Sequence, residues 1–325
     1  MSKSFLISLL FPSGTGSGDV RELTQEQILN WQPAQGILWL HLNYRNPDAR
    51  QLLMGVGVSK VDTETLLSAD SRPRVLVTKE RMLMTLRGVN VNPDSDPEDM
   101  VAVRLYADEC RIITSSDRKV RSLAELAEQL LKGGGPTRPG SFILAFCRSL
   151  TLKKVTLIYN LEDKLADLED QVLQQSSAEI RTELADLRRK IITLRRYLIP
   201  QKEAFFEVIN TPSLLTQEDK INMRDNYNTL IRVIEDLDGI RDQAVVTQEE
   251  LSNQLTEQLN KRLYFLSLIT GIFFPLSFLT GLLGVNIGGI PGVHDPQAFA
   301  WFCLGLMALL VIQVALLYSF RWLKH

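Results

Sequence analysis

The chain has 325 residues, with 36 Lys and Arg against 38 Asp and Glu, so its formal net charge is only -2. Acidic and basic residues are interspersed along the sequence and form no basic face, which excludes nucleic-acid binding. Cys110, Cys147 and Cys303 lie far apart, so neither a disulfide framework nor a zinc finger is expected and a reducing compartment fits best. The chain length suggests two or three folding units.

Residues 1–140 mix strand and helix patterns and predict a soluble α/β domain that faces the cytoplasm. The first helix has a capping box, with Thr24 as N-cap and Gln27 three residues later. The expected strands are Phe5 to Phe11, Gly36 to Tyr44, Arg74 to Thr78, Arg81 to Val89, Val101 to Tyr106 and Arg111 to Ser115, the last four as two hairpins. The expected helices are Thr24 to Trp31, Asp62 to Ala69 and Val120 to Lys132. Glycines and prolines from Gly133 to Gly140 mark a hinge or boundary.

Residues 141–262 predict a stalk of long helices that pack on one another. Apolar residues step by three and four along this segment, which is the period of a coiled coil. Pro200 is expected to kink or interrupt the second helix, and Thr211 to Ser213 to end it. A third helix begins near Gln217 and contains no breaker strong enough to end it before Leu283, so one helix is predicted to enter the membrane.

The C-terminal part predicts two transmembrane helices, 263–283 and 298–320, because neither segment contains a charged residue and each reaches the roughly 20 residues that span a bilayer. Lys and Arg flank both spans on the side of the stalk and of the tail, 321–325. The connecting loop, 284–297, has neither residue. By the positive-inside rule both termini face the cytoplasm.

One face of the first span carries small and hydroxyl-bearing residues. At heptad spacing it comprises Thr256, Asn260, Leu263, Ser267, Thr270, Phe274, Ser277, Gly281 and Gly284. This pattern suits a water-filled path and equally suits a tight helix seam, and both interpretations stay open. Two helices cannot enclose such a path, so transport requires an oligomer.

The spans contain no Asp, Glu, Lys, Arg or His, which indicates that a transported cation keeps its water. Stripping a divalent ion would cost far more than hydroxyls and amides return. Asn286, in the loop segment Gly284, Val285 and Asn286, is expected to contact the outer hydration shell. Asp295 would attract cations to the outer mouth, with a solvated loop residue as the other interpretation, and His294 is a candidate proton-binding group or an idle surface histidine.

The whole chain resembles the CorA-type family of divalent metal transporters. The resemblance rests on the α/β domain, the helix entering the membrane, the two C-terminal spans and Gly284-Val285-Asn286, where the family has Gly-Met-Asn. Val285 and the segment Ile287 to Gly292 resemble its zinc-transporting branch, ZntB. Other matching stretches are Leu40 to Tyr44, Ser71 to Val75, Arg195 to Tyr197 and Phe278 to Gly281.

This resemblance implies a funnel-shaped homopentamer in the bacterial inner membrane that transports Zn²⁺ rather than holding it as a cofactor. It implies that Gly284, Val285 and Asn286 form the outer selectivity ring, with Asn286 facing hydrated metal. The implied pore-lining residues are Asn260, Leu263, Thr270, Phe274, Ser277 and Gly281. It also implies proton-coupled uptake, with efflux, or channel-like passage of Mg²⁺ and other divalent cations, as alternatives.

Two other classes of protein, an enzyme and a membrane-anchored scaffold, are alternatives to a transporter. The segment Gly14 to Gly18 follows a strand but lacks the Lys and helix start of a phosphate loop, and no nucleophile arrangement is evident, so an enzyme is not expected. The remaining alternative is a coiled-coil scaffold. In that case the helical hairpin formed by the two spans, 263–283 and 298–320, only tethers the scaffold to the membrane. The acidic residues of the stalk are expected to be its solvated faces, with regulatory metal sites as the other interpretation.

Overall fold

The computed structural model describes residues 7–11, 20–70, 72–92, 95–174, 177–285, 292 and 295–319. These fall into two compact units, Met1–Gln248 and Glu249–His325, so the boundary predicted near residue 140 lies inside the first unit. Asn286, His294, the segment 14–18 and the tail 321–325 lie outside the described residues.

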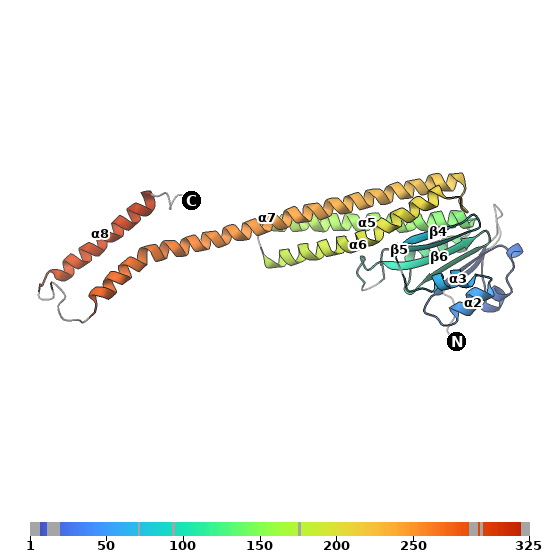
Figure 1. Ribbon diagram of the computed structural model, residues 1–325, viewed down its shortest axis with the longest axis horizontal. Coiled ribbons are helices and arrows are strands. Elements are labelled where there is room, and N and C mark those ends of the chain that lie inside the picture. The colour runs from blue at the N-terminus through green and yellow to red at the C-terminus, as the bar shows by residue number, and fades with distance from the viewer. Residues whose placement is uncertain are drawn as a thin grey trace. The chain divides into compact units, whose positions relative to one another are not determined.

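The first unit is built on a seven-stranded mixed sheet with the order β2-β1-β3-β7-β6-β5-β4 (Figure 1). The strands are β1 (Ile7–Phe11), β2 (Arg21–Glu22), β3 (Ile37–Asn43), β4 (Arg74–Val77), β5 (Arg81–Gly88), β6 (Val101–Asp108) and β7 (Arg111–Ser116). Among the described pairs, β3 and β7 are parallel and the others are antiparallel. Both predicted hairpins, β4–β5 and β6–β7, are confirmed.

Both faces of this sheet are covered, and β3, at its centre, is buried from Ile37 to Leu42. One face packs against α1 (Gln25–Leu29), α2 (Ala49–Gly55) and α3 (Lys60–Leu66) through a core that contains Leu38, Leu40 and Tyr106. Successive strand residues point to opposite faces. Trp39 therefore points to the other face, where its ring lies 4.7 Å from that of Phe142 on α5 (Pro139–Gln174).

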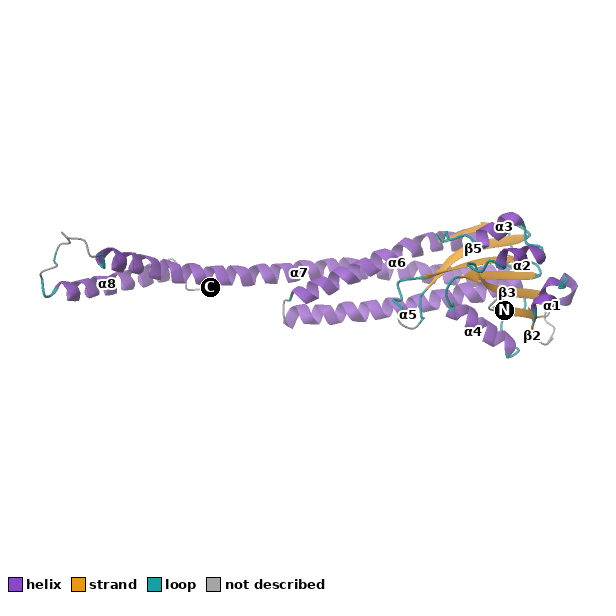
Figure 2. Cartoon of the chain, turned by 90° about the horizontal axis from the view of Figure 1, so that it is seen from below, coloured by secondary structure: helices purple, strands orange, loops and turns teal. Residues whose placement is uncertain are grey.

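Long helices complete the first unit. In both views α5, α6 (Ala178–Asn210) and the first half of α7 (Gln217–Leu283) lie side by side (Figures 1 and 2). The predicted heptad residues of α5 and α6 are buried, from Ile158 to Val172 and from Ile180 to Leu198. Polar contacts join the helices as well, since Arg195 lies 2.9 Å from Asp238 and the Thr247 hydroxyl donates to Glu169 at 2.9 Å.

The predicted interruption at Pro200 does not occur, because α6 runs without a break to Asn210 and ends at Thr211. Proline removes one helical hydrogen bond and crowds the preceding turn. Leu198 and Phe205, on either side of it, are buried and hold the helix through this point.

The second unit holds the rest of α7 and α8 (Ala298–Ser319). Both helices are long and apolar enough to cross a membrane. The prediction that one helix runs unbroken from Gln217 to Leu283 is confirmed, as is the capping box of Thr24 and Gln27. The sequence patterns did not predict α2 or the two-residue β2; the N-cap of α2, Asp48, makes no side-chain hydrogen bond of the kind that marks the start of α1.

Lys154 on α5 is a buried basic residue, and the cost of its burial can be tested. It is 2 % exposed and its ammonium donates to the Leu150 carbonyl at 3.1 Å, while none of the ion pairs found among the described residues includes it. Burial lowers the pKa of Lys154 from 10.5 to about 7. The unfolded chain therefore binds more protons between these two values, and stability rises with pH across this interval.

Lys154→Met should remove this penalty and raise the free energy of unfolding at pH 7 by about 1 to 3 kcal/mol. Urea unfolding followed by circular dichroism at pH 7 and pH 10 should show a gain that shrinks at the higher pH. Lys164→Met, which removes an exposed partner of Glu183, should change stability by less than about 1 kcal/mol at either pH. A gain that stays equal at both pH values would contradict the prediction.

Candidate functional site

The predicted pore-lining residues lie along one stripe of α7, which we call the pore face. It comprises Asn260, Leu263, Thr270, Phe274, Ser277 and Gly281. Their spacing of three, four or seven residues places them on one side of a helix with 3.6 residues per turn. All six are exposed in the single chain, and the larger side chains, Leu263 and Phe274, are 60 % and 68 % exposed.

A second stripe of α7 faces α8 and is less exposed. On α7 the half-buried residues of the span include Tyr264, Leu268, Ile272, Leu276 and Leu279. On α8 they include Ala298, Phe302, Leu306, Gln313 and Leu317. At about 100° per residue this stripe lies roughly opposite the pore face. The hairpin therefore leaves the pore face free for water or for other copies of the chain.

Two threonine hydroxyl groups of this region donate to the helix backbone. The Thr270 hydroxyl donates to the Leu266 carbonyl at 2.8 Å, and the Thr280 hydroxyl donates to the Ser277 carbonyl at 3.0 Å. A hydroxyl oxygen that donates in this way keeps its lone pairs for other partners. The Thr270 oxygen on the pore face can therefore accept a hydrogen bond from the water around a cation.

The tripeptide begins where α7 ends. The Gly284 amide donates to the Thr280 carbonyl at 2.9 Å, and a Cβ at Gly284 would lie 2.9 Å from the same oxygen. Glycine therefore allows this close turn. Val285 is 44 % exposed, whereas Asn286 lies outside the described residues.

Asp295 has a local structural role just before α8. Its carboxylate accepts a hydrogen bond from the Gln297 amide at 2.9 Å, and its own amide donates to Gly292 at 3.0 Å. These contacts form a turn that leads into the helix. The carboxylate is exposed, so its charge still acts on the surrounding solvent.

No group of three or more His, Cys, Asp and Glu side chains that could hold a metal occurs among the described residues. His41, in a matching stretch of β3, is buried, with Nδ1 3.0 Å from the Thr114 hydroxyl. Burial lowers the pKa of His41 to about 4, so the ring is neutral at pH 7. It is a core residue of the sheet.

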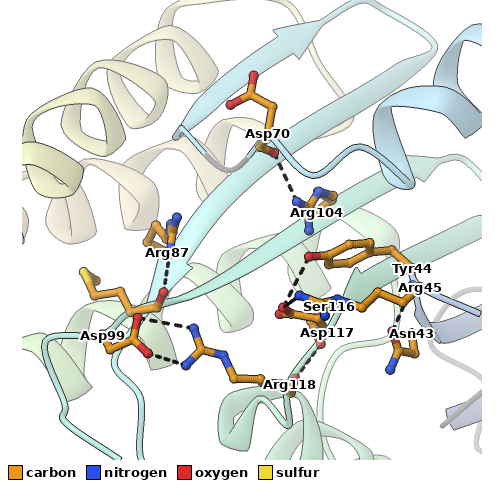
Figure 3. A network of polar contacts seen from close by, with 11 residues as sticks. Asn43, Tyr44, Arg45, Asp70, Arg87, Asp99, Arg104, Ser116, Asp117 and Arg118 are labelled. Atoms are coloured by element: carbon orange, nitrogen blue, oxygen red, sulfur yellow. Dashed lines mark hydrogen bonds and ion pairs between the residues drawn. The ribbon is translucent and has the colours of Figure 1, made fainter.

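The most prominent polar cluster of the first unit is rich in arginine (Figure 3). Arg104 on β6 is 1 % exposed, donates to the Asp70 carbonyl at 3.1 Å and lies 4.3 Å above the Tyr44 ring. Tyr44 in turn donates to Asp117 at 3.2 Å. Burial lowers the pKa of the Arg104 guanidinium.

Two further arginines extend the cluster at the ends of β5 and β7. Arg118 pairs with Asp99 at 2.6 Å, and its hydrogen bond lowers the pKa of that carboxyl. Arg87 donates to the Met100 carbonyl and lies 4.2 Å from the Tyr197 ring. The cluster joins strand ends to neighbouring loops and to α6, and its positive charge would repel a metal ion. The pore face is therefore the candidate site.

Comparison with known proteins places the chain in a family. Residues 34–319 match the family described as CorA-like Mg2+ transporter protein, which confirms the resemblance. The chain therefore belongs to the CorA family of divalent cation transporters and is a membrane transport protein, not an enzyme.

Two curated relatives have nearly equal identity. The divalent cation transporter CmaX of Pseudomonas aeruginosa is 36% identical over 96% of this chain and 95% of its own. The zinc transport protein ZntB of Yersinia enterocolitica is 34% identical over 95% of this chain and 92% of its own. The solved full-length CmaX structure is 33% identical, covers 99% of both chains and has a TM-score of 0.84. The fold is confirmed, while the assignment to the zinc branch stays a prediction.

The close turn at Gly284 provides a test of the helix end. Gly284→Ala should push the last turn of α7 apart, because its Cβ would meet the Thr280 carbonyl oxygen at 2.9 Å. Backbone hydrogen exchange should then be faster at residues 280–284 by about fivefold, as expected when a hydrogen bond worth about 1 kcal/mol is lost. Gly305→Ala on α8 is the matched control, since nothing lies within 4 Å of its Cβ position. Equal exchange rates in both variants would refute the claim that the close turn at Gly284 requires glycine.

Proposed function

We propose that the protein transports hydrated Zn²⁺ across the bacterial inner membrane along the pore face of a homopentamer. The observation that carries this proposal is the position of the pore face, which is uncharged, bears hydroxyls and lies on the side of α7 away from α8. A single hairpin cannot enclose a water-filled path with this face. Several copies around an axis can do so, each contributing one α7.

The chemistry of the face favours an ion that keeps its water. Moving a bare divalent ion into a low-dielectric passage costs well over the roughly 20 kcal/mol of a single unit charge. Thr270 and Ser277 offer neutral oxygen atoms, which suit a hydration shell better than a bare metal. Dehydrated zinc prefers His nitrogen and Cys sulfur, and the pore face contains neither. The pore face should therefore select cations by their hydrated size and charge.

Zinc is the proposed substrate because Val285 replaces the methionine of the family tripeptide, as in the zinc branch that the sequence resembles. The name of the Yersinia relative supports zinc, whereas that of the Pseudomonas relative supports divalent cations in general. Passage of Mg²⁺ or other divalent cations is therefore the alternative. Asn286 is proposed to contact the hydration shell at the outer entrance, with Asp295 and His294 at the mouth.

Proton-coupled uptake is the proposed mode of transport, with efflux as the other direction. The two spans hold no carboxylate or histidine for a proton relay inside the bilayer. Protons would therefore bind at the mouth, at the cytoplasmic entrance, or move through the water of the path. The proposed orientation has both termini in the cytoplasm, which the flanking Lys and Arg residues support.

The first experiment tests the selectivity residue. Asn286→Ala in liposomes containing the purified full-length protein should lower Zn²⁺ flux by about tenfold or more, because the amide no longer holds the hydrated ion at the entrance. A fluorescent zinc indicator inside the liposomes measures the flux. Gln297→Ala, a change of another loop amide, should leave the flux within about twofold.

No flux in the parent protein would favour the membrane-anchored scaffold over the transporter. Equal flux in the parent and Asn286→Ala would instead remove the amide from the selectivity element. Repeating the parent measurement with Mg²⁺, Ni²⁺ and Cd²⁺ separates zinc preference from general divalent transport.

The second experiment tests proton coupling. Zn²⁺ uptake should rise when the outside of the liposome is made more acidic than the inside by about one pH unit, since an inward proton gradient then drives symport. A protonophore should abolish the rise. If flux is the same with and without the gradient, uptake is channel-like and symport is excluded.

A further inference from the structure

Pro275 creates a local defect inside the membrane-spanning part of α7. In an α-helix each carbonyl accepts a hydrogen bond from the amide four residues later. Proline has no amide hydrogen, so the carbonyl of Gly271 loses its partner, although α7 continues through this point to Leu283. An unpartnered carbonyl is costly in the bilayer, where no water is available to replace the bond.

Gln313 of α8 supplies the missing donor. Its side-chain amide nitrogen lies 3.5 Å from the Gly271 carbonyl oxygen, and Gly271 is the residue whose helical partner is Pro275. Gln313 is also the one amide side chain in the α8 sequence, and it lies on the half-buried stripe that faces α7. This bond gives a physical reason for a polar residue, Gln313, in a membrane span at the height of Pro275.

The defect lies at the same height along α7 as part of the pore face, but on the side that Gln313 of α8 reaches. Thr270 directly precedes Gly271, and Phe274 directly precedes Pro275. Thr270 and Phe274 are pore-face residues. The Thr270 hydroxyl also donates to the Leu266 carbonyl four residues back, a contact that often bends helices. Two bending features therefore occur within ten residues of α7, and the contact from Gln313 reaches the helix between them.

We propose that Gln313 is a positioning residue for transport: its amide caps the Gly271 carbonyl that Pro275 leaves open, and so fixes the bend of α7 and the direction of the pore face. This proposal rests on the proposed transport along the pore face. Gln313 itself lies on the side of α7 away from that face and does not contact the ion. Its loss should therefore change the maximal rate and leave the half-saturating Zn²⁺ concentration unchanged.

The interaction can be tested by a double-mutant cycle. Gln313→Met keeps the side-chain length and removes the donor, and should lower the maximal Zn²⁺ flux of full-length protein in liposomes about threefold, the effect of a typical hydrogen bond between transmembrane helices. Pro275→Ala restores the amide that Gly271 needs. In the Pro275→Ala background, Gln313→Met should therefore have no further effect on flux.

Leu304→Met serves as the matched control for a methionine in α8, because Leu304 is 62 % exposed and lies off the half-buried stripe. It should transport like the parent. Flux that is unchanged in Gln313→Met, or that falls equally with and without Pro275→Ala, would overturn the proposal. A parallel shift of maximal rate and half-saturating concentration would also overturn it, since this would place Gln313 at the ion.

Thermal unfolding in detergent distinguishes this inference from the proposed function. The melting temperature is measured for the parent, Gln313→Met, Pro275→Ala and the double variant. Gln313→Met should lower it only when Pro275 is present. If this coupling is found but the parent has no flux, the capping bond stands and the transport role of Gln313 falls with the proposed function. If Asn286→Ala abolishes flux while Gln313 and Pro275 are uncoupled, transport stands and this inference falls.

Discussion

Every backbone polar group of α7 must find its partner within protein once the helix enters the bilayer, because the hydrocarbon core offers no water. This constraint explains why the predicted span is unbroken helix from Leu263 to Leu283. It also explains why the carbonyl that Pro275 leaves without a helical partner lies next to a polar side chain of α8. The pore face can then be neutral, since the Thr270 hydroxyl donates to the backbone and has oxygen left for water.

The periodic elements of the fold were predictable from the sequence. Burial on one side of a helix or strand leaves a clear pattern, so the two hairpins, the heptads of α5 and α6 and both spans were found. The short elements α2 and β2 left no such pattern. The interruption expected at Pro200 does not occur, because buried neighbours on both sides keep α6 intact.

The candidate site was predictable to a similar extent. The spacing of small and hydroxyl residues identified the pore face, but it could not say which side of α7 would meet α8. That assignment needed the exposure of both helices. The pairing of Gln313 with Gly271, 42 residues apart, also left no sequence signal, because contact across a hairpin depends on how the two helices align. The arginine cluster was missed for the same reason, since Arg104 meets Tyr44, and Arg87 meets Tyr197, only in the folded chain.

The unbroken course of α7 has a consequence for how this protein can change over evolutionary time. Each residue added to or removed from a helix turns everything beyond it by about 100°. A single insertion between Leu251 and Asn260 would thus turn the pore face by about 100° about the helix axis relative to the residues before it, although no residue of the tripeptide had changed. The number of residues in this stretch therefore sets the direction of the pore face as much as the side chains do.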